Sequence, residues 1–417
     1  MTHPCVTGIA AVVAPYDGEG PYPRVFARHG WRTVAVVPEP RPRPWTYPPS
    51  AGSAGHTGAV VHRGVRQTVK ALRALGVSAV VAGSAGGIET AERIAWQLGL
   101  PGADPASSPL RYDRGAQAAL LCRVGIPALR SIRTTSLADA LAWARALPRP
   151  GYLLAPAVTG TPVAPVECAN ALQIGTAWPA MRSAAARQCG SPHLVLSERP
   201  SRRQYTVNSA TRPGPRGRPE HVVTDLWADV RTRHGRLDRA DLLAPGSALS
   251  RTLSAATVRV LDALGVLCGP ATTRFVYGDD DRAEDGPLLV CALAAPVVTP
   301  ADEALRAATG HDRAAEALET WIPSPSSRPV PAPGGQHLVR VRMCPRAAST
   351  PWTDAVLRSL PTVVAVGEVR TPAGRVPAEA VLCGSEPSAV EQDYRAIRAL
   401  ERGRQLPHLV APRMKPL

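Results

Sequence analysis

The glycine-rich stretch at residues 83–87, with the sequence G-S-A-G-G, is one segment whose residue types could do chemistry. It lies between an apolar run and a helical pattern, and the backbone amides of such a turn can cradle an anion. It matches neither the G-x-G-x-x-G pattern of a dinucleotide site nor the G-x-x-x-x-G-K-[ST] pattern of a P-loop. A tight strand-to-helix turn is the simpler interpretation, and anion binding is the alternative.

Two charged loops offer binding chemistry of opposite sign. The acidic run at residues 279–281 could hold a cation, and the three arginines within residues 212–219 could bind a polyanion. A solvated hairpin loop is the simpler interpretation of both. The eight cysteines form no C-x-x-C pair, which argues against a zinc site or a redox motif. The ten histidines are dispersed and no G-x-S-x-G elbow is present, so no nucleophilic triad is predicted.

The chain of 417 residues is strongly basic, with a formal net charge of +15, and Lys70 and Lys415 are its only lysines. The many arginines are scattered, and only 4% of residues are aromatic, so the sequence does not predict a nucleic-acid partner. No apolar stretch approaches the ~20 residues of a membrane span. With cysteines that are far apart, we expect reduced thiols and a cytoplasmic protein with no membrane contact.

The first hundred residues alternate between strand-like and helix-like patterns. Apolar runs predict strands at residues 6–14, 33–38 and 77–82, and helical spacing is found at residues 23–30, 61–75 and 88–98. Such alternation predicts a parallel, doubly wound α/β sheet, with the turn at residues 83–87 at the carboxyl ends of its strands.

The remainder of the chain is predicted to be mixed. Helices are expected at residues 112–124, 136–146 and 255–264, with Ser136 as an N-cap. From residue 151 onward the pattern becomes mainly β-like, with strands expected at residues 152–158, 194–197, 205–209, 221–227, 273–277 and 288–293. A segment rich in proline and serine at residues 324–335 predicts a linker before a last small α/β unit.

The order of these pieces resembles the ATP-grasp superfamily, in particular its carboxylate–amine ligases of the amino-acid or peptide type. The resemblance is carried by residues 83–102, by R-Y-D-R at 111–114 with G-I-P at 125–127, by V-V-T-D-L-W at 222–227, by A-L-G-V at 263–266 before G-P at 269–270, by T-G-H-D at 309–312 and by the tail helix at 388–401. It implies a multidomain α/β and α+β architecture of the ATP-grasp fold. The implied units are an N-terminal α/β domain at 1–105, a helical segment plus small ATP-grasp subdomain at 106–198, a C-terminal ATP-grasp subdomain at 199–323 and an α/β extension at 336–417.

The resemblance implies ATP-dependent chemistry between the two ATP-grasp subdomains. Such ligases phosphorylate a carboxylate with ATP, and an amine then displaces the phosphate. Cationic side chains must surround the triphosphate, and acidic side chains must hold the Mg²⁺ that bridges its oxygens. Carried over residue by residue, the nucleotide-binding positions are Arg114, Ala155, Thr159, Gly160, Leu196, Ser197 and Glu198, of which the last three would face the adenine edge.

The sequence departs from the family where the chemistry is done. Two phosphate lysines of the family fall at Arg114 and Ala155, and Pro162 removes a backbone donor from the loop that would cover the phosphates. The metal-ligand positions fall at Arg274, Cys291 and Leu293, and the substrate-clamping arginine of the family falls at Ala295. None of these side chains offers the oxygen ligands that Mg²⁺ prefers.

We therefore expect a catalytically degenerate ATP-grasp protein without catalytic residues, which binds ATP weakly, takes no Mg²⁺ and acts as a binding or scaffolding partner. It would form a homodimer, or a heterodimer with an active ATP-grasp ligase. The alternative is an active ligase that joins a small-molecule carboxylate to an amine, with arginines replacing lysines and metal. Arg274 needs a partner if it is buried. We expect a protein acid or backbone carbonyls to fill that role, and the alternative is a bound phosphate or carboxylate.

Overall fold

The computed structural model describes residues 8–15, 22–38, 55–147, 151–161, 163–214, 218–232, 236–277, 286–295, 306, 312, 315–316, 320–321, 336–343, 354–371 and 374–402. Several segments discussed above lie outside these ranges. They are Pro162, the middle of the arginine loop at 215–217, the acidic run at 279–281, most of the T-G-H-D motif at 309–312 and the linker at 324–335.

The N-terminal unit is a four-stranded parallel sheet in the order β3-β2-β1-β4. Its strands and helices are β1 (Ile9–Val13), α1 (Tyr22–Arg28), β2 (Arg32–Pro38), β3 (Gly58–His62), α2 (Val65–Ala74), β4 (Ala79–Ala82) and α3 (Ile88–Leu98). Alternate residues of β1 pack on opposite sides: Ala11 and Val13 contact α2 and α3, whereas Ala10 and Val12 contact α1. The doubly wound α/β architecture is thus confirmed. The helical pattern expected from residue 61 was wrong at its start, because residues 61 and 62 end the edge strand β3.

The next segment builds a small antiparallel sheet in the order β5-β8-β6-β7. Its elements are a 3-10 helix, η2 (Pro105–Arg111), then α4 (Arg114–Arg123), β5 (Ser131–Thr134), α5 (Leu137–Arg145), β6 (Tyr152–Pro156), β7 (Val166–Cys168), α6 (Ala171–Cys189) and β8 (Leu194–Glu198). The Oγ of Ser136 accepts a hydrogen bond from the backbone N–H of Asp139, as expected of an N-cap. The nineteen-residue helix α6 corrects the β-like interpretation of the region after residue 151. Asn170 caps its first turn, and Gly190 ends it in a left-handed conformation.

The large sheet has eight strands in the order β13-β12-β9-β10-β11-β14-β16-β15. Its elements are β9 (Arg203–Pro213), β10 (Pro219–Arg231), β11 (Leu237–Leu242), α7 (Ala248–Ala263), β12 (Gly269–Val276), β13 (Leu288–Leu293), β14 (His337–Arg342), α10 (Asp354–Arg358), β15 (Val363–Thr371), β16 (Gly374–Gly384) and α11 (Pro387–Glu401). The C-terminal strands make no sheet of their own in the described residues, because β14 pairs with β11 and extends the large sheet.

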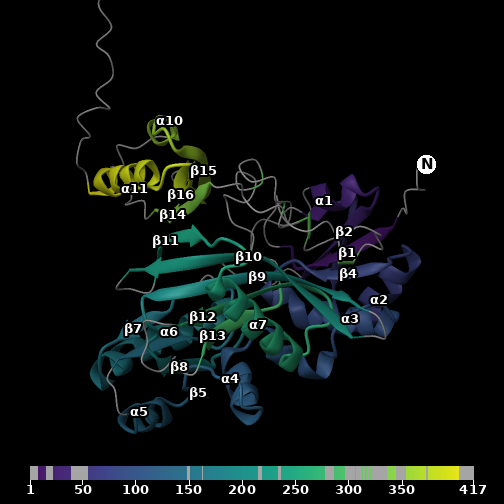
Figure 1. The fold of residues 1–417 in the computed structure, drawn as a ribbon. Coiled ribbons are helices and arrows are strands. Elements are labelled where there is room, and N and C mark those ends of the chain that lie inside the picture. The colour runs from purple at the N-terminus through teal and green to yellow at the C-terminus, as the bar shows by residue number, and fades with distance from the viewer. Residues whose placement is uncertain are drawn as a thin grey trace, which may run out of the picture.

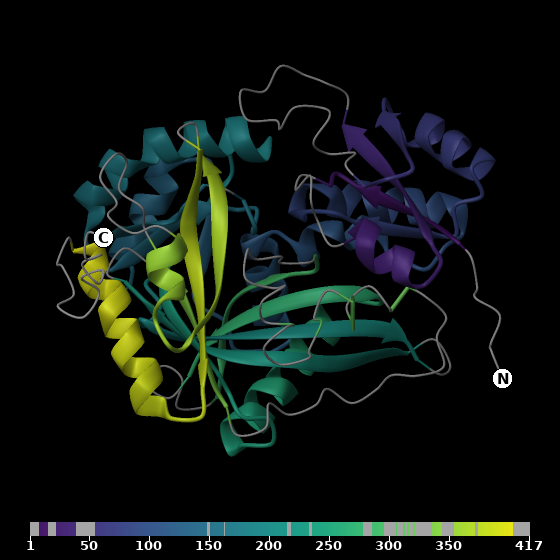
Figure 2. The same cartoon turned by 90° about the horizontal axis from the view of Figure 1, so that it is seen from above.

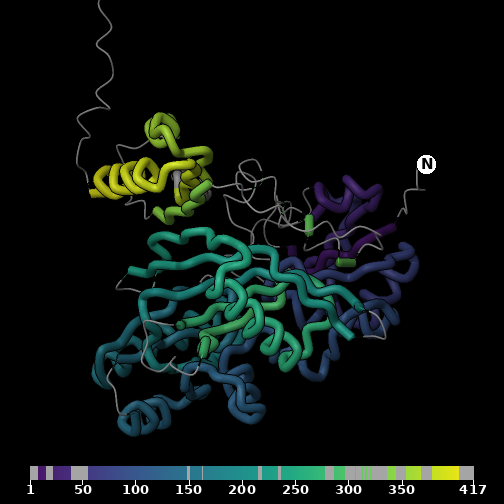
Figure 3. Tube along the Cα trace, viewed as in Figure 1, coloured from purple at the N-terminus to yellow at the C-terminus, as the bar shows by residue number. Residues whose placement is uncertain are grey.

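The views of the backbone in Figures 1, 2 and 3 show how the three units are arranged. Figures 1 and 2 show the N-terminal unit and the C-terminal hairpin β15–β16 with α11 at opposite ends of the molecule. The Cα trace in Figure 3 shows the small sheet on one side of the large one. Among the described helices, none is long and apolar enough to cross a membrane.

The two faces of the large sheet have different chemistry because strand side chains alternate. On β9 and β12, Tyr205, Val207 and Phe275 pack into an apolar core under α4 and α7. The alternate residues on the same strands, Thr206, Asn208 and Arg274, point to the other face, where they line a cleft. The sheet thus presents a polar, arginine-bearing surface to the small sheet.

Candidate functional site

A cleft of about 710 Å³ lies between the small and the large sheet. Leu153, residues 159–161 and 163–165 and Glu167 contribute from the small sheet, and strands β9 to β14 and Glu379 on β16 contribute from the large one. Among the described residues, seven arginines and three acids line it. The arginines are Arg114, Arg202, Arg231, Arg236, Arg274, Arg340 and Arg342, and the acids are Glu167, Asp229 and Glu379. The excess of positive charge makes the cleft complementary to an anion.

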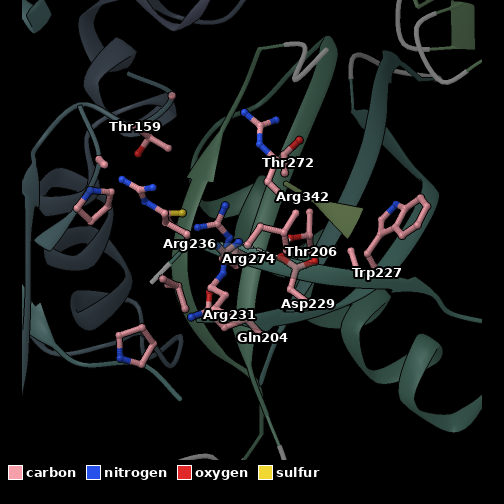
Figure 4. Close-up of a pocket in the computed structure, with 18 of the residues that line it drawn as sticks. Thr159, Gln204, Thr206, Trp227, Asp229, Arg231, Arg236, Thr272, Arg274 and Arg342 are labelled. Carbon is pink, nitrogen blue, oxygen red and sulfur yellow. Dashed lines mark hydrogen bonds and ion pairs between the residues drawn. The ribbon is translucent and has the colours of Figure 1, made fainter. Parts of the chain in front are cut away.

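Arg274 stands on β12, opposite Cys291 on β13 in the antiparallel register. Its Nε atom is buried and has no hydrogen-bond partner, and no ion pair to Arg274 is found in the described part of the chain. The expectation that a protein acid or carbonyl neutralises this side chain is therefore wrong for the described residues. Figure 4 shows Arg274 beside Arg231 in the cleft, with Thr159 on the facing wall.

Arg114 is the first residue of helix α4 and enters the cleft from a different element. The helix is fixed there because the Asp113 carboxylate caps it, accepting hydrogen bonds from the N–H groups of Gly115 and Ala116 and pairing with Arg133 at 2.9 Å. The Nε atom of Arg114 is also buried without a partner among the described residues. Burial lowers the pKa of Arg114, the Cys291 sulfur opposes this, and the charge of Arg274 lowers the pKa further.

Arg231 ends β10 and was missed by the sequence reasoning. Its guanidinium pairs with Asp229 at 2.9 Å, and Asp229 also accepts a hydrogen bond from the Oγ1 of Thr206 at 2.7 Å. Burial lowers the pKa of Arg231 to about 10, and the charge of Arg274 contributes to the shift in spite of Asp229. The signal was present in the sequence, because a strand continued past Trp227 places residues 229 and 231 on the same face as Trp227.

The sequence also did not predict a second ion pair in the cleft, between Arg340 and Glu379. Nε of Arg340 on β14 donates to the buried Glu379 on β16 at 2.6 Å, and its guanidinium lies 5.3 Å from the Trp227 ring. The two charged residues come from strands that are adjacent in the sheet but 39 positions apart in sequence, so no local pattern could have joined them. Glu379 therefore already has an arginine partner within the cleft.

The loop after β6 covers part of the cleft. Thr159 is buried, and its Oγ1 has no hydrogen-bond partner among the described residues. Gly160 has a φ of +73°, and a Cβ at this position would lie 2.9 Å from the Leu293 side chain and 3.2 Å from Ala85. The glycine therefore allows this loop to approach β13 and the turn at residues 83–87. Ala85 of that turn also packs with Leu293 and Ala295, so the turn faces the same region.

The remaining carried-over positions lie in the small sheet. Ala155 and Ser197 line a second cavity of about 20 Å³, which has room for roughly one water molecule. Leu196 is fully buried and packs among the residues beneath α5 and α6. The Glu198 carboxylate pairs with Arg130, and its N–H donates to the carbonyl oxygen of Arg130 at 3.1 Å. Leu196, Ser197 and Glu198 lie on the interior strand β8, and Ala155 lies on the neighbouring strand β6. None of the four is among the described residues that line the larger cleft.

The residues that the resemblance assigns to the metal-ligand positions do not match the preference of Mg²⁺ for oxygen. Arg274, Cys291 and Leu293 converge on the cleft, but their side chains provide nitrogen–hydrogen donors, a thiol and a hydrocarbon. Of the three acids among the described lining residues, Asp229 and Glu379 already pair with arginines. In the part of the chain that the structure describes, no group of three or more histidines, cysteines and acids could hold a metal ion.

Comparison with solved structures identifies proteins of the same fold. An L-amino acid ligase from Bacillus licheniformis aligns with a TM-score of 0.69 at 13% identity over 94% of this chain and 97% of its own. N5-carboxyaminoimidazole synthetase from Staphylococcus aureus, complexed with ADP, aligns with a TM-score of 0.69 at 9% identity over 93% and 96%. Carboxyaminoimidazole ribonucleotide synthase from Aspergillus clavatus, complexed with ATP, aligns with a TM-score of 0.67 at 12% identity over 96% and 99%.

No family model and no curated protein sequence matches the chain. At these identities the structural likeness shows the fold alone. The chain therefore has the ATP-grasp fold of carboxylate–amine ligases, as its sequence motifs indicated.

Proposed function

We propose that this protein is a catalytically degenerate ATP-grasp protein, which binds a phosphate-bearing ligand of the nucleotide class and acts as a binding partner rather than as a ligase. The observation that carries the proposal is the cleft itself. It keeps a volume of about 710 Å³ and a strongly basic lining, while the positions of the family's metal ligands hold Arg274, Cys291 and Leu293. The cleft thus keeps the positive charge needed to bind an anion, but not the side chains that would hold the metal ion for catalysis.

Ligation asks more of the site than binding does. Transfer of a phosphoryl group to a carboxylate requires the charge on its oxygens to be neutralised as it moves and the two reactants to be held in line. Ala155 offers no charge in the small sheet, and Ala295 offers none where the family clamps its substrate. We infer that a bound nucleotide keeps its terminal phosphate.

An active ligase is the second candidate, and the arginine cluster favours it. Guanidinium groups bind phosphate oxygens in bidentate fashion, and an arginine brought to a transferring phosphate can stabilise the developing charge. If Arg114, Arg231 and Arg274 act in this way, the cleft would join a carboxylate to an amine without the lysines of the family. The two candidates differ in whether the protein converts ATP to ADP: only the ligase would do so.

Binding and turnover of ATP should be measured on the same preparation. Calorimetric titration is expected to show ATP binding. An assay for ADP and phosphate, supplied with ATP, Mg²⁺ and the twenty amino acids singly and in pairs, should show no release above the rate without protein. Amino-acid-dependent ADP release that is lost in Arg274→Gln but kept in Arg395→Gln would establish the ligase and refute the degenerate protein. Arg395 is a suitable control because it is exposed on α11 and pairs with Glu391 outside the cleft.

A ligand in the cleft should protect Cys291 from alkylation. Cys291 lines the cleft opposite Arg274, whereas Cys122 is exposed on α4 outside it. We expect iodoacetamide to modify Cys291 slowly in the free protein and at least tenfold more slowly with saturating ATP, while Cys122 reacts at an unchanged rate. Peptide mass spectrometry measures both sites at once. Equal rates at Cys291 with and without ATP would place the ligand elsewhere.

The partner remains part of the proposal. A degenerate member of an enzyme fold can act by pairing with another subunit, and we propose either a homodimer or a heterodimer with an active ATP-grasp ligase. Light scattering on the purified chain distinguishes the first arrangement from a monomer. Co-expression with an intact ATP-grasp ligase, followed by affinity purification of either chain, tests the second.

A further inference from the structure

We propose that the cleft binds phosphate groups directly through the guanidinium groups of Arg114, Arg231 and Arg274, in the absence of a divalent metal ion. This inference rests on the proposed function in one respect, namely that the ligand carries phosphates. It goes further because it replaces the metal ion of the fold by a cluster of arginines in this chain.

The three guanidinium groups come from three elements that meet only in the folded protein. Arg114 begins α4, Arg231 ends β10, and Arg274 lies on β12 at the register position of Cys291. All three line the cleft. Arg274 is close enough to both of the others for its charge to act on them.

The cluster carries hydrogen-bond donors that no described residue of the protein accepts. The Nε atoms of Arg114 and Arg274 are buried and lack hydrogen-bond partners among the described residues. The Oγ1 of Thr159 on the facing wall is likewise buried and without a partner among them. Buried donors are normally satisfied, because an unpaired one retains the cost of its lost hydration. Arg231 is different, since it keeps Asp229 as a partner and adds charge to the cluster.

An anion is the chemical group that completes this arrangement. Like charges that share a buried site repel each other. Among the described residues, Asp229 pairs with Arg231, and the Asp113 carboxylate acts on Arg114 but already pairs with Arg133 and caps α4, so these two acids leave positive charge in the cluster. A phosphate accepts several hydrogen bonds from arginines and brings the missing negative charge. A tri- or diphosphate matches three separate guanidinium groups better than a single carboxylate does, because its oxygens extend over several bonds.

A metal ion would work against this cluster. Mg²⁺ seeks oxygen ligands, and it would enter a region whose nearest side chains are cationic. Free Mg²⁺ would instead compete with the protein by binding the phosphates in solution. Metal dependence in this protein should therefore have the opposite sign to that of an enzyme that binds the magnesium complex of ATP.

Calorimetric titrations with sodium tripolyphosphate and with ATP, each in EDTA and in excess Mg²⁺, test the inference. We expect tripolyphosphate and ATP to bind in EDTA and to bind several-fold more weakly in Mg²⁺. Arg274→Gln should lower the affinity in EDTA at least tenfold, and the control Arg395→Gln should leave it within twofold.

The outcomes separate the inference from the proposed function. Tripolyphosphate binding without ATP binding would keep the arginine site and refute a nucleotide ligand. ATP binding that requires Mg²⁺ and ignores Arg274→Gln would overturn the arginine site and leave nucleotide binding intact. Binding of neither probe under any condition would overturn both. If Arg274→Gln fails to fold, Arg114→Gln provides the same test from helix α4.

Discussion

Reversing the charge of Arg274 should abolish phosphate binding and at the same time raise the stability of the unliganded protein. Arg274→Glu places a carboxylate between Arg114 and Arg231, which Arg274 now repels. The new acid gains two cationic neighbours, while the incoming phosphate meets a negative charge in place of a guanidinium. We expect the affinity for tripolyphosphate to fall at least about a hundredfold, a loss of roughly 2.7 kcal/mol or more.

Thermal unfolding of Arg274→Glu measures the stability of the unliganded protein, and calorimetry on the same variant measures its affinity for tripolyphosphate. An arginine with a purely structural role would show the opposite pattern, since its loss would lower the melting temperature. A melting temperature that falls in Arg274→Glu, together with unchanged phosphate affinity, would therefore contradict our assignment. Arg395→Glu on α11 controls for the change in net charge of the whole chain.

We also expect a large loss of stability when Glu92 is substituted. Glu92 lies in the contact between the N-terminal unit and the rest of the chain. Its carboxylate accepts hydrogen bonds from Arg111 and from the Oγ of Ser108, and Arg111 is fully buried. Arg111 also donates to the carbonyl oxygens of Asp104 at 2.6 Å and Leu264 at 3.1 Å. Glu92→Gln leaves a buried guanidinium without its counter-charge, which costs about 3–5 kcal/mol of unfolding free energy.

Urea denaturation measures this loss, and Glu220→Gln is the matched control. Glu220 makes the same kind of pair with Arg212 at 2.8 Å, but both side chains are substantially exposed. Its substitution should change the unfolding free energy by less than about 1 kcal/mol. Equal effects of the two substitutions would show that the Glu92–Arg111 pair does not hold the units together.

Much of the fold could be predicted where elements carry their own signals. Helix α3 spans residues 88–98 as expected, and Gly99 ends it in the left-handed conformation that its glycine suggested. Strand β13 also has its predicted bounds. Helix α6 was missed because Gly175 and Pro179 interrupt its pattern, although its first turn is capped by Asn170.

Some of the residues expected at the site line the larger cleft, and others, such as Ala155 and Leu196, do not. The sequence placed Arg114, Arg274 and Cys291 in one cleft through the resemblance, and the structure brings all three to it. The sequence could not show that Arg274 has no hydrogen-bond partner for its Nε atom among the described residues, because this depends on every strand around it. Arg231 could have been found by continuing the strand pattern past Trp227, whereas the Arg340–Glu379 pair depends on strand pairing across the large sheet, which local patterns do not encode.

The most direct test of the central claim is the ³¹P NMR spectrum of ATP with this protein in EDTA. The claim is that guanidinium groups contact the phosphates and that no metal ion mediates the contact. We predict that the β and γ phosphorus signals broaden and shift on addition of the wild-type protein, and that Arg274→Glu returns them to the positions of free ATP. Signals that stay at their free positions in EDTA and respond only after Mg²⁺ is added would contradict the account.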